Sequence, residues 1–393
     1  RACAGNAGRI PLMNQRVIKS IEVDGRTMKQ KKTNPYYTRK IEPAGVRKGM
    51  PVTVLIDECF TSFNARNFRD ACRLFVDRIL AENTTIGLSV SGALTPAGLG
   101  RSSLVPLIKS GYVDWIVSTG ANLYHDMHAS LGYAMYEGSP TVDDRELRDN
   151  EVVRIHDIFF KADALFDTDR FIRDLFRSLS FDQPVSSAEV HAILGKELLK
   201  RWPDSHNYSV LAAAAKMDVP VHTSSPGDSS IGMNLAGLEL EGKGPRVDPH
   251  LDVNLTAAWV YQAKKNKGRT AAVILGGGSP KNFLLQTEPH IQEVMGLKEA
   301  GQDYFIQFTD ARADTGGLSG ATPSEAVTWG KIDPSMLSHS LVCYGDCSVY
   351  LPLFTAYALS AGVKRKPRRL WKTWRESLAF IEKAYRRSPL WGK

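Results

Sequence analysis

Thr270-Ala-Ala-Val-Ile-Leu-Gly-Gly-Gly-Ser279 is the stretch that decides the fold of this 393-residue chain. Five apolar residues stand in a row before the three glycines. A short, continuous apolar run bounded by glycine is typical of a strand that is buried on both faces. Glycine directly after such a strand permits a tight turn into a helix. The stretch therefore predicts one strand–turn–helix unit of an α/β protein.

The same pattern occurs five more times along the chain. Each apolar run ends in a small, polar, mostly glycine-containing loop, and a helical stretch follows. Buried parallel strands joined by crossover helices produce this alternation, so we predict an α/β fold with a doubly wound, mostly parallel sheet and helices on both faces. Ligands bind such sheets at the carboxyl ends of the strands, where these loops lie. The other five runs are Thr85–Val90, Val113–Val117, Val219–His222, Tyr304–Phe308 and Leu341–Tyr344.

Composition divides the chain into three predicted parts. Residues 1–50 mix Gly, Pro, Lys and Arg without periodicity, and we predict a basic N-terminal arm with one short strand at Val17–Val23. Residues 51–363 form the predicted catalytic domain. Within it, residues 140–205 are charged and predict a mostly helical insertion or cover. Residues 364–393 form a basic, Trp-rich C-terminal extension.

Charge is distributed unevenly over these parts. The chain has 50 Lys+Arg and 42 Asp+Glu, a formal charge of +8, yet residues 1–50 and 361–393 carry +9 each and the middle carries −10. We do not expect a nucleic-acid-binding body, because such proteins concentrate Lys and Arg on their folded surface. An acidic body instead attracts cationic ligands such as amines. The basic ends are typical of subunit-docking extensions, and an acidic protein partner is the alternative that we do not expect.

The C-terminal extension interleaves tryptophans with basic residues. Trp371 and Trp374 stand among Arg368, Arg369 and Lys372. Such interleaving can bind RNA or phospholipid. We favour a solvated helix whose tryptophans face inward and dock on a neighbouring subunit.

Other features set limits on location and metal binding. The longest mostly apolar run, Val349 to Val363, contains Pro352 and is too short to span a bilayer, so we predict no membrane segment. Cys343 and Cys347 are four apart, but no second Cys/His pair follows at metal-site spacing, so no metal site is predicted. Five cysteines in a long chain do not indicate a disulfide framework. We therefore expect a reducing, cytoplasmic location.

The most specific motif lies at residues 320–332, Gly-Ala-Thr-Pro-Ser-Glu-Ala-Val-Thr-Trp-Gly-Lys-Ile. Pro323 suits a first helical turn, and Glu325 and Trp329 are four apart and share one helix face. Gly330 ends that turn and presents Lys331. A lysine beside an indole in an enclosed site loses hydration, which lowers its pKa and supplies the neutral amine that imine formation needs. The alternative is a surface lysine that follows a core tryptophan.

These residues resemble the active-site segment of deoxyhypusine synthase. The resemblance covers roughly residues 55–360, with matching segments in the same order. Besides Trp329-Gly-Lys-Ile, these segments are Ser319-Gly-Ala, Pro323-Ser-Glu-Ala-Val, Gly276-Gly-Gly with Lys281, Ser118-Thr-Gly-Ala-Asn-Leu-Tyr-His-Asp126, Asp228-Ser-Ser-Ile-Gly232 and Asp346.

The resemblance implies a Rossmann-like, NAD-dependent fold and a homotetramer with active sites between paired subunits. In this family NAD takes hydride from a secondary amine of spermidine, and the resulting imine is split. The aminobutyl group is then held as an imine on the lysine that matches Lys331. An acceptor amine takes the group over, and the new imine is reduced. The acceptor is one lysine of a translation factor in deoxyhypusine synthase and free putrescine in the related homospermidine synthases.

The resemblance also implies roles for individual residues. Those matching the catalytic segment are Glu325, Trp329 and Lys331. A substrate role is further expected for Ser230, His125 and Asn282. Those matching the NAD contacts are Ser91, Thr119, Gly120, Asp228, Gly277, Ala311 and Asp346.

Several acids with which the family grips a tri-cation are replaced in this chain. Met233 and Leu318 stand where carboxylates are expected, and Asn282 stands where a histidine is expected. Tyr124 and His125 replace two glutamates of the eukaryotic enzyme. A buried ammonium without a carboxylate partner is costly, so a smaller, less charged or guanidino-bearing amine is favoured. Candidate substitutes for the lost acids are Asp126, Asp310 and Asp314.

The Tyr-His-Asp version resembles the bacterial deoxyhypusine synthase-like branch, which favours a small-molecule acceptor, as in the homospermidine synthases. Two alternatives remain open. One is a protein-modifying enzyme that acts on a lysine of a translation factor. The other is a non-catalytic NAD-binding scaffold.

Overall fold

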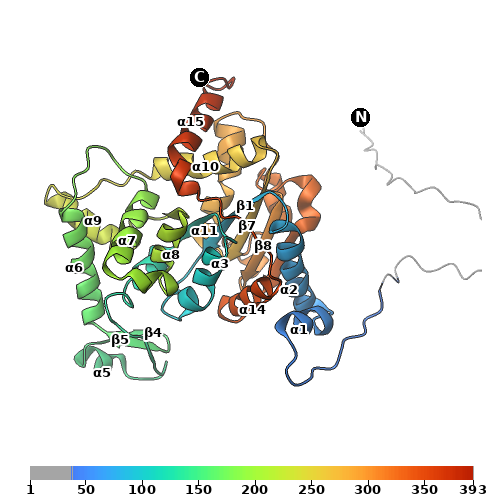
Figure 1. Cartoon of the computed structure of the whole chain (residues 1–393), viewed down its shortest axis with the longest axis horizontal. Coiled ribbons are helices and arrows are strands. Elements are labelled where there is room, and N and C mark those ends of the chain that lie inside the picture. The colour runs from blue at the N-terminus through green and yellow to red at the C-terminus, as the bar shows by residue number, and fades with distance from the viewer. Residues whose placement is uncertain (1–36, 38, 393) are drawn as a thin grey trace, which may run out of the picture. The chain divides into compact units, whose positions relative to one another are not determined.

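The computed structural model describes Tyr37 and residues 39–392. The strand predicted at Val17–Val23 lies outside these residues. From Pro43 onward the chain forms one compact unit built on a six-stranded sheet (Figure 1). All five pairs of neighbouring strands are parallel, which confirms the predicted fold class. The strands are β1 (Thr84–Val90), β2 (Trp115–Ser118), β6 (Val221–Thr223), β7 (Arg269–Leu275), β8 (Tyr304–Thr309) and β9 (Ser340–Tyr344).

The strand order identifies where a ligand would bind. The sheet runs β6-β2-β1-β7-β8-β9, so the chain builds one half outward from β1 and the other half outward from β7. This is the strand order of the dinucleotide-binding Rossmann fold. The order reverses between β1 and β7, and the crevice at such a switch point is where nucleotides bind.

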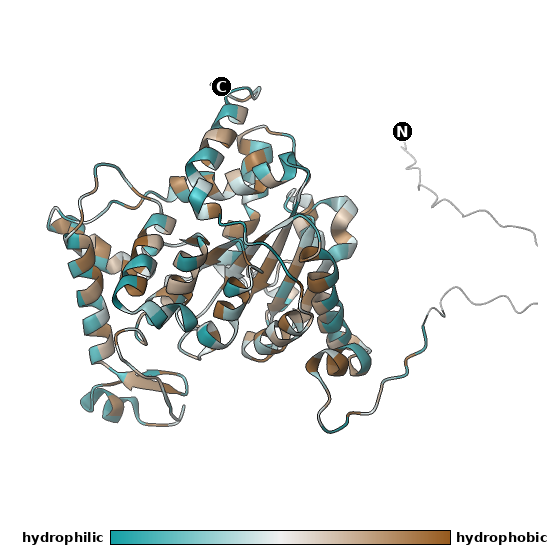
Figure 2. Ribbon diagram, viewed as in Figure 1, coloured by the Kyte–Doolittle hydropathy of each residue, from teal (hydrophilic) through white to brown (hydrophobic). Residues whose placement is uncertain are grey.

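Strand β7 is buried on both faces, as its sequence predicts. Ala271, Val273 and Leu275 face one hydrophobic core, whereas Ala272 and Ile274 face a second core on the other side. Figure 2 shows hydrophobic residues on the central strands and mixed colours along the outer helices. The helices are α1 (Val52–Cys59), α2 (Phe63–Arg73), α3 (Val105–Lys109), α4 (Gly120–His125), α5 (Asp144–Asp149), α6 (Asp163–Arg177), α7 (Ser187–Arg201), α8 (Val210–Met217), α9 (Ser230–Leu240), α10 (Pro249–Lys265), α11 (Gly278–Leu285), α12 (Thr287–Pro289), α13 (Pro323–Thr328), α14 (Cys347–Ser360) and α15 (Trp374–Tyr385).

The segment 140–205, predicted to be mostly helical, also contains a β-hairpin. Strand β4 (Val152–Ile155) pairs antiparallel with β5 (Ile158–Lys161), and the two-residue strand β3 (Tyr136–Glu137) adds to its edge. The hairpin turns at His156, whose φ of 54° is left-handed. Four-residue strands are too short to show an alternating pattern beside the long helices α6 and α7.

The C-terminal extension packs against its own chain. Helix α15 lies beside α10 (Figure 1), and the stacked rings of Trp371 and Trp374, 5.6 Å apart, pack against the second core. The two tryptophans therefore face inward, as predicted, and pack against the second core of their own chain.

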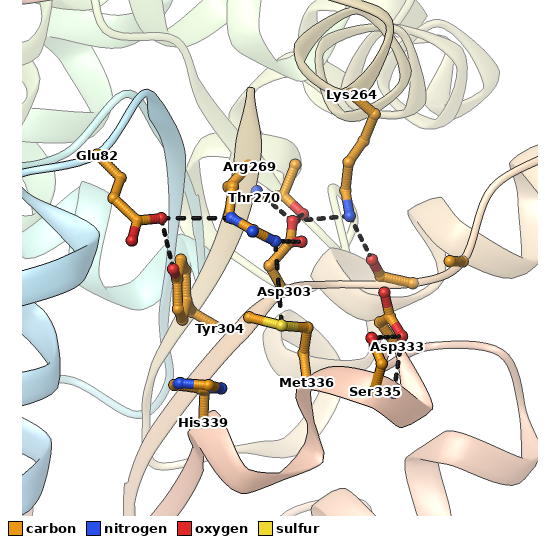
Figure 3. A network of polar contacts seen from close by, with 12 residues as sticks. Glu82, Lys264, Arg269, Thr270, Asp303, Tyr304, Asp333, Ser335, Met336 and His339 are labelled. Carbon is orange, nitrogen blue, oxygen red and sulfur yellow. Dashed lines mark hydrogen bonds and ion pairs between the residues drawn. The ribbon is translucent and has the colours of Figure 1, made fainter. Parts of the chain in front are cut away.

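Buried ion pairs fix the amino ends of the strands. Asp303, before β8, accepts hydrogen bonds from the backbone N of Thr270 at 2.8 Å and from Arg269 at 2.8 Å, and Lys264 Nζ lies 2.7 Å away (Figure 3). Before β2, Asp114 binds both Arg365 Nη2 at 2.6 Å and the backbone N of Ile86 at 2.8 Å. These ion pairs lie at the amino ends of the strands, opposite the loops that are predicted to bind ligands.

Arg365 should contribute strongly to stability, because its pair with Asp114 is buried: the side chains are 7% and 0% exposed. Replacing it in Arg365→Met leaves the buried Asp114 carboxylate with the more distant cation of Arg368, whose Nε lies 3.5 Å away. We expect the free energy of unfolding, measured by urea denaturation, to fall by about 3–5 kcal/mol. The control Arg386→Ala breaks a pair with Glu382 on exposed α15 and should cost under about 1 kcal/mol. Equal losses in both variants would contradict the assigned role of Arg365.

Candidate active site

Helix α13 positions the lysine motif. Thr322 caps its first turn by accepting a hydrogen bond from the backbone N of Glu325 at 3.2 Å, and Pro323 occupies the first helical position as predicted. The helix ends at Thr328, and Gly330 follows with a left-handed φ of 64°. The left-handed backbone conformation favours glycine there, and a Cβ on Gly330 would also lie 2.6 Å from Gln292 Oε1 and displace that side chain.

The backbone of Lys331 is held on both sides. Its N donates to the carbonyl of Ala326, and its carbonyl accepts from Gln302 N, both at 3.0 Å. Gln292 Nε2 in addition donates to the carbonyl of Gly330 at 2.8 Å. The start of the Lys331 side chain is therefore fixed from α13, from the chain before β8 and from residues 290–294.

A cavity of about 280 Å³ lies between α11 and α13. It brings together four residues that the sequence predicts to be functional, namely Asn282, Glu325, Trp329 and Lys331. The remaining lining residues are Lys281, Leu285, Gln286, Phe305, Leu318, Ala321, Thr322 and Ala326.

Lys331 is half-buried in this cavity. Its Nζ donates to Asn282 Oδ1 at 2.9 Å and lies 5.6 Å from the ring centroid of Trp329. Burial lowers the pKa of Lys331, and the nearby carboxylates of Glu325 and Glu293 oppose that shift. Because its hydrogen-bond partner is a neutral amide, Lys331 lacks the direct carboxylate contact that would hold it protonated.

A second lysine, which the sequence analysis noted only as part of a matching segment, lies in the same cavity. Lys281 is 3% exposed, and its Nζ donates to Gln307 Oε1 at 3.0 Å, to the Ser319 carbonyl at 3.3 Å and to the Ala321 carbonyl at 2.7 Å. Three acceptors match the three donors of an ammonium group. Burial and the neighbouring Lys331 lower the pKa of Lys281 to about 8. Lys281 is therefore mainly charged at neutral pH.

Ser319 connects this cavity to the loops at the strand ends. Its hydroxyl accepts from Gly278 N at 2.8 Å, and its carbonyl accepts from Gln307 Nε2 at 2.8 Å. A Cβ on Gly277 would lie 2.4 Å from the Cα of Ser319. The glycine loop after β7 is thus packed directly against the segment that leads to Lys331.

The residues predicted to contact NAD follow the carboxyl ends of all six parallel strands. Ser91 and Gly277 meet at the switch point, where the Ser91 hydroxyl donates to the Gly277 carbonyl and accepts from Gly277 N. Asp346 caps α14 and accepts from Ser348 N at 2.8 Å, which lowers the pKa of its carboxyl. Thr119 and Gly120 follow β2, Asp228 follows β6, and Ala311 follows β8.

The geometry of these loops fits a dinucleotide. Gly92, Gly227 and Gly278 follow β1, β6 and β7, and a Cβ built on any of them would meet no atom within 4 Å. A cofactor could therefore approach the backbone closely at the ends of the neighbouring strands β1 and β7 and at the end of β6. Helices α9 and α11 begin beside the loops after β6 and β7, α14 begins after β9, and helix N-termini favour negative phosphate groups.

His125 and Ser230 are not part of the Lys331 cavity. His125 lines another cavity of about 550 Å³, together with Arg101 and Tyr133. Its Nδ1 lies 3.0 Å from His128 Nε2, and burial lowers the pKa of His125 to about 4, so the ring is neutral at pH 7. Ser230 begins α9, whose Asn234 donates to the Ser230 carbonyl.

Two of the candidate substitute acids already have structural partners. Asp126 accepts hydrogen bonds from Ser209 Oγ at 2.6 Å and Val210 N at 2.7 Å and so caps α8. Asp314 pairs with Arg312 at 2.6 Å. Neither carboxylate lines the Lys331 cavity.

Two further features concern metals and membranes. In the described part of the chain, no group of three or more His, Cys, Asp or Glu side chains is placed to hold a metal ion. Among the residues with assigned structure, no helix combines the length and apolar character needed to cross a bilayer.

The fold and the site define an α/β protein with Rossmann strand order and a buried lysine cavity beside its nucleotide-type loops. A family model described as "Deoxyhypusine synthase" matches residues 56–358. A "Deoxyhypusine synthase-like protein" of Nostoc punctiforme is 51% identical over 348 residues, 88% of each chain. The "Probable deoxyhypusine synthase 2" of Methanosarcina acetivorans is 35% identical over 79% of this chain and 87% of its own. The chain belongs to the deoxyhypusine synthase family.

A solved structure supports the fold. The crystal structure of a deoxyhypusine synthase candidate from Entamoeba histolytica covers 83% of this chain and 99% of its own, with a TM-score of 0.54 and 14% identity. At that identity the likeness concerns the fold alone. The family resemblance drawn from the sequence motifs is confirmed by the family model and the relatives.

The neutral partner of Lys331 can be tested by Asn282→Asp, which places a carboxylate beside Nζ and should raise the pKa of Lys331 by about 1–3. We would follow reductive methylation of Lys331 against pH by peptide mass spectrometry. In the unaltered protein Lys331 should react at lower pH than exposed Lys243, and in Asn282→Asp its profile should move to higher pH. Identical profiles for Lys331 and Lys243 in the unaltered protein would contradict the lowered pKa.

Proposed function

We propose that this protein is an NAD-dependent aminoalkyl transferase that works through an imine on Lys331, with a small polyamine or related amine as acceptor. The observation that carries the proposal is the half-buried Lys331, whose amine is held by the neutral amide of Asn282 beside the Trp329 ring. A desolvated lysine without a direct carboxylate contact supplies the neutral amine that imine chemistry requires.

The residues of the cavity have separate tasks. The neutral amine of Lys331 attacks the imine carbon of the oxidised donor, a C–N bond forms, and the departing amine leaves with a proton. Glu325, one turn before Trp329 in the same cavity, is placed to pair with the terminal ammonium or to pass that proton. The indole of Trp329 forms one wall and interacts favourably with a cation at its face.

The loops at the strand ends would hold the cofactor. NAD, when bound, supplies a reversible hydride acceptor. The glycine loops after β1, β6 and β7 let its pyrophosphate approach the backbone. The carboxylate of Asp346, kept ionised by its cap, suits a ribose hydroxyl.

The acceptor is proposed to be small because the cavity has few acids. Glu325 is the only carboxylate among its lining residues in the described chain, and Leu318 stands where the family has another. The chain segment 51–360 nevertheless carries −10, which attracts cationic amines. The protein-lysine alternative differs only in the acceptor, and the same assay distinguishes it.

We also propose a homo-oligomer, with a tetramer as the family expectation. Trp329 is 58% exposed and Leu318 is 49% exposed, although both line the cavity. A second copy that covers these side chains would complete the exclusion of water from the site.

Lys331→Arg tests the covalent step, because arginine keeps its proton and cannot form an imine. We expect the variant to release no transferred product from spermidine, putrescine or agmatine and to give no adduct after borohydride trapping. NAD binding, measured by calorimetry, should be unchanged. Lys243→Arg, on the exposed surface, should behave like the unaltered protein. Normal product formation by Lys331→Arg would reject Lys331 as the carrier.

Gly227→Val tests the cofactor loops. The valine side chain enters open space beside Asp228, so the fold should tolerate it while a bound dinucleotide should not. We expect NAD affinity to fall about tenfold or more, equivalent to about 1.4 kcal/mol, with an unchanged melting temperature. Gly237→Ala, in α9 with equally open surroundings, serves as control. Unchanged NAD affinity in Gly227→Val would count against this placement.

A further inference from the structure

A second cavity of about 440 Å³ adjoins the Lys331 cavity. Asn282, Gln286 and Leu318 line both cavities, so these three side chains form the boundary between them. One boundary residue, Asn282, is the hydrogen-bond partner of Lys331 Nζ. The second cavity therefore lies directly beside the residue that holds the Lys331 amine.

The second cavity contains one carboxylate, Glu293. Glu293 is exposed to solvent and makes no ion pair or side-chain hydrogen bond with the residues that the structure describes. Its neighbour His290 bonds to Asn254 through Nε2 at 3.0 Å, and burial lowers its pKa, so this ring does not compete as a cation. Apolar side chains of Val253, Phe283, Pro289 and Val294 complete the walls.

Glu293 is also close enough to act on the reactive lysine. The carboxylates that raise the pKa of Lys331 are Glu325, from the first cavity, and Glu293, from the second. Two carboxylates that line different cavities thus act on the same lysine. The segment that carries Glu293, residues 290–294, also holds Gly330 through Gln292.

We propose that Glu293 binds the distal cationic group of the acceptor, which is then an amine with two cationic groups, such as a diamine or a guanidino amine. This inference rests on the proposed function. Glu325 pairs with the end of the aminoalkyl group held on Lys331. The near amine of the acceptor attacks the imine carbon, the new C–N bond forms, and the bond to Lys331 breaks as its nitrogen takes the proton. The apolar walls contact the methylene chain between the two cationic groups.

The test compares two acceptors that differ only in the distal charge, 1,4-diaminobutane and butylamine, with NAD and excess spermidine as donor. Glu293→Gln should raise KM for the diamine about tenfold, as expected for loss of a charge-assisted contact, without changing kcat. KM for butylamine should stay the same. Glu293→Asp should restore part of the affinity, and Glu376→Gln, on exposed α15, should have no effect. The inference would be overturned if Glu293→Gln changed KM equally for both acceptors, or if it left KM for the diamine unchanged.

Two controls separate this inference from the proposed function. Borohydride trapping of the donor-derived adduct on Lys331 tests the function in the unaltered protein. Calorimetric binding of 1,4-diaminobutane in the presence of NAD tests Glu293 without turnover. If no adduct forms but Glu293→Gln weakens diamine binding, the transfer fails and the subsite stands. If the adduct forms and diamine binding is unchanged in the variant, the subsite fails and the transfer stands.

Discussion

The buried ammonium of Lys281 is the interaction on which the site depends. It binds Gln307 from strand β8 and two carbonyls, Ser319 and Ala321, from the loop that precedes α13. Ser319 in turn contacts the glycine loop after β7, so one cation joins the cofactor loops to the segment that carries Lys331. The neighbouring Lys331 and burial together lower the pKa of Lys281, whereas burial of Lys331 itself lowers the pKa of Lys331. Lys281 thus helps to position the segment that carries Lys331, and the reactivity of Lys331 follows from its own burial.

The groups that stabilise the sheet and the groups predicted to bind ligands lie at opposite ends of the strands. Asp114 and Asp303 bind arginines, a lysine and backbone N–H groups at the amino ends, where their charges are buried and paired. The carboxyl ends carry glycines that leave space above them, and the carboxylates there, such as Asp228 and Asp346, are exposed. The ion pairs at the amino ends hold the strands in register. The loops at the carboxyl ends are therefore free to be shaped by ligand contacts.

The sequence was informative where structure is local. The six parallel strands were predictable because each lies in a short, mostly apolar run that ends in a small polar loop, and the α13 segment because Pro323 and Gly330 mark its ends. The hairpin β4–β5 was not, since four residues show no period. Lys281 could not be recognised as a fixed ammonium, because its acceptors are 26 to 40 residues away in the chain and meet only in the fold. Likewise, no local pattern shows that His125 and Lys331 line different cavities.

The central pair of strands has a consequence for how the molecule is made. Strands β1 and β7 are neighbours, yet Ser91 and Gly277, which meet at their ends, are 186 residues apart. During synthesis one edge of β1 therefore stays unpaired until β7 has been made. Unpaired apolar strand edges are prone to aggregate. Arg365, which bonds to the carbonyl of Thr84 at the start of β1, arrives later still. The basic C-terminal segment thus supplies the last contact to the first strand. A chain that ended before Arg365 would lack this hydrogen bond to β1.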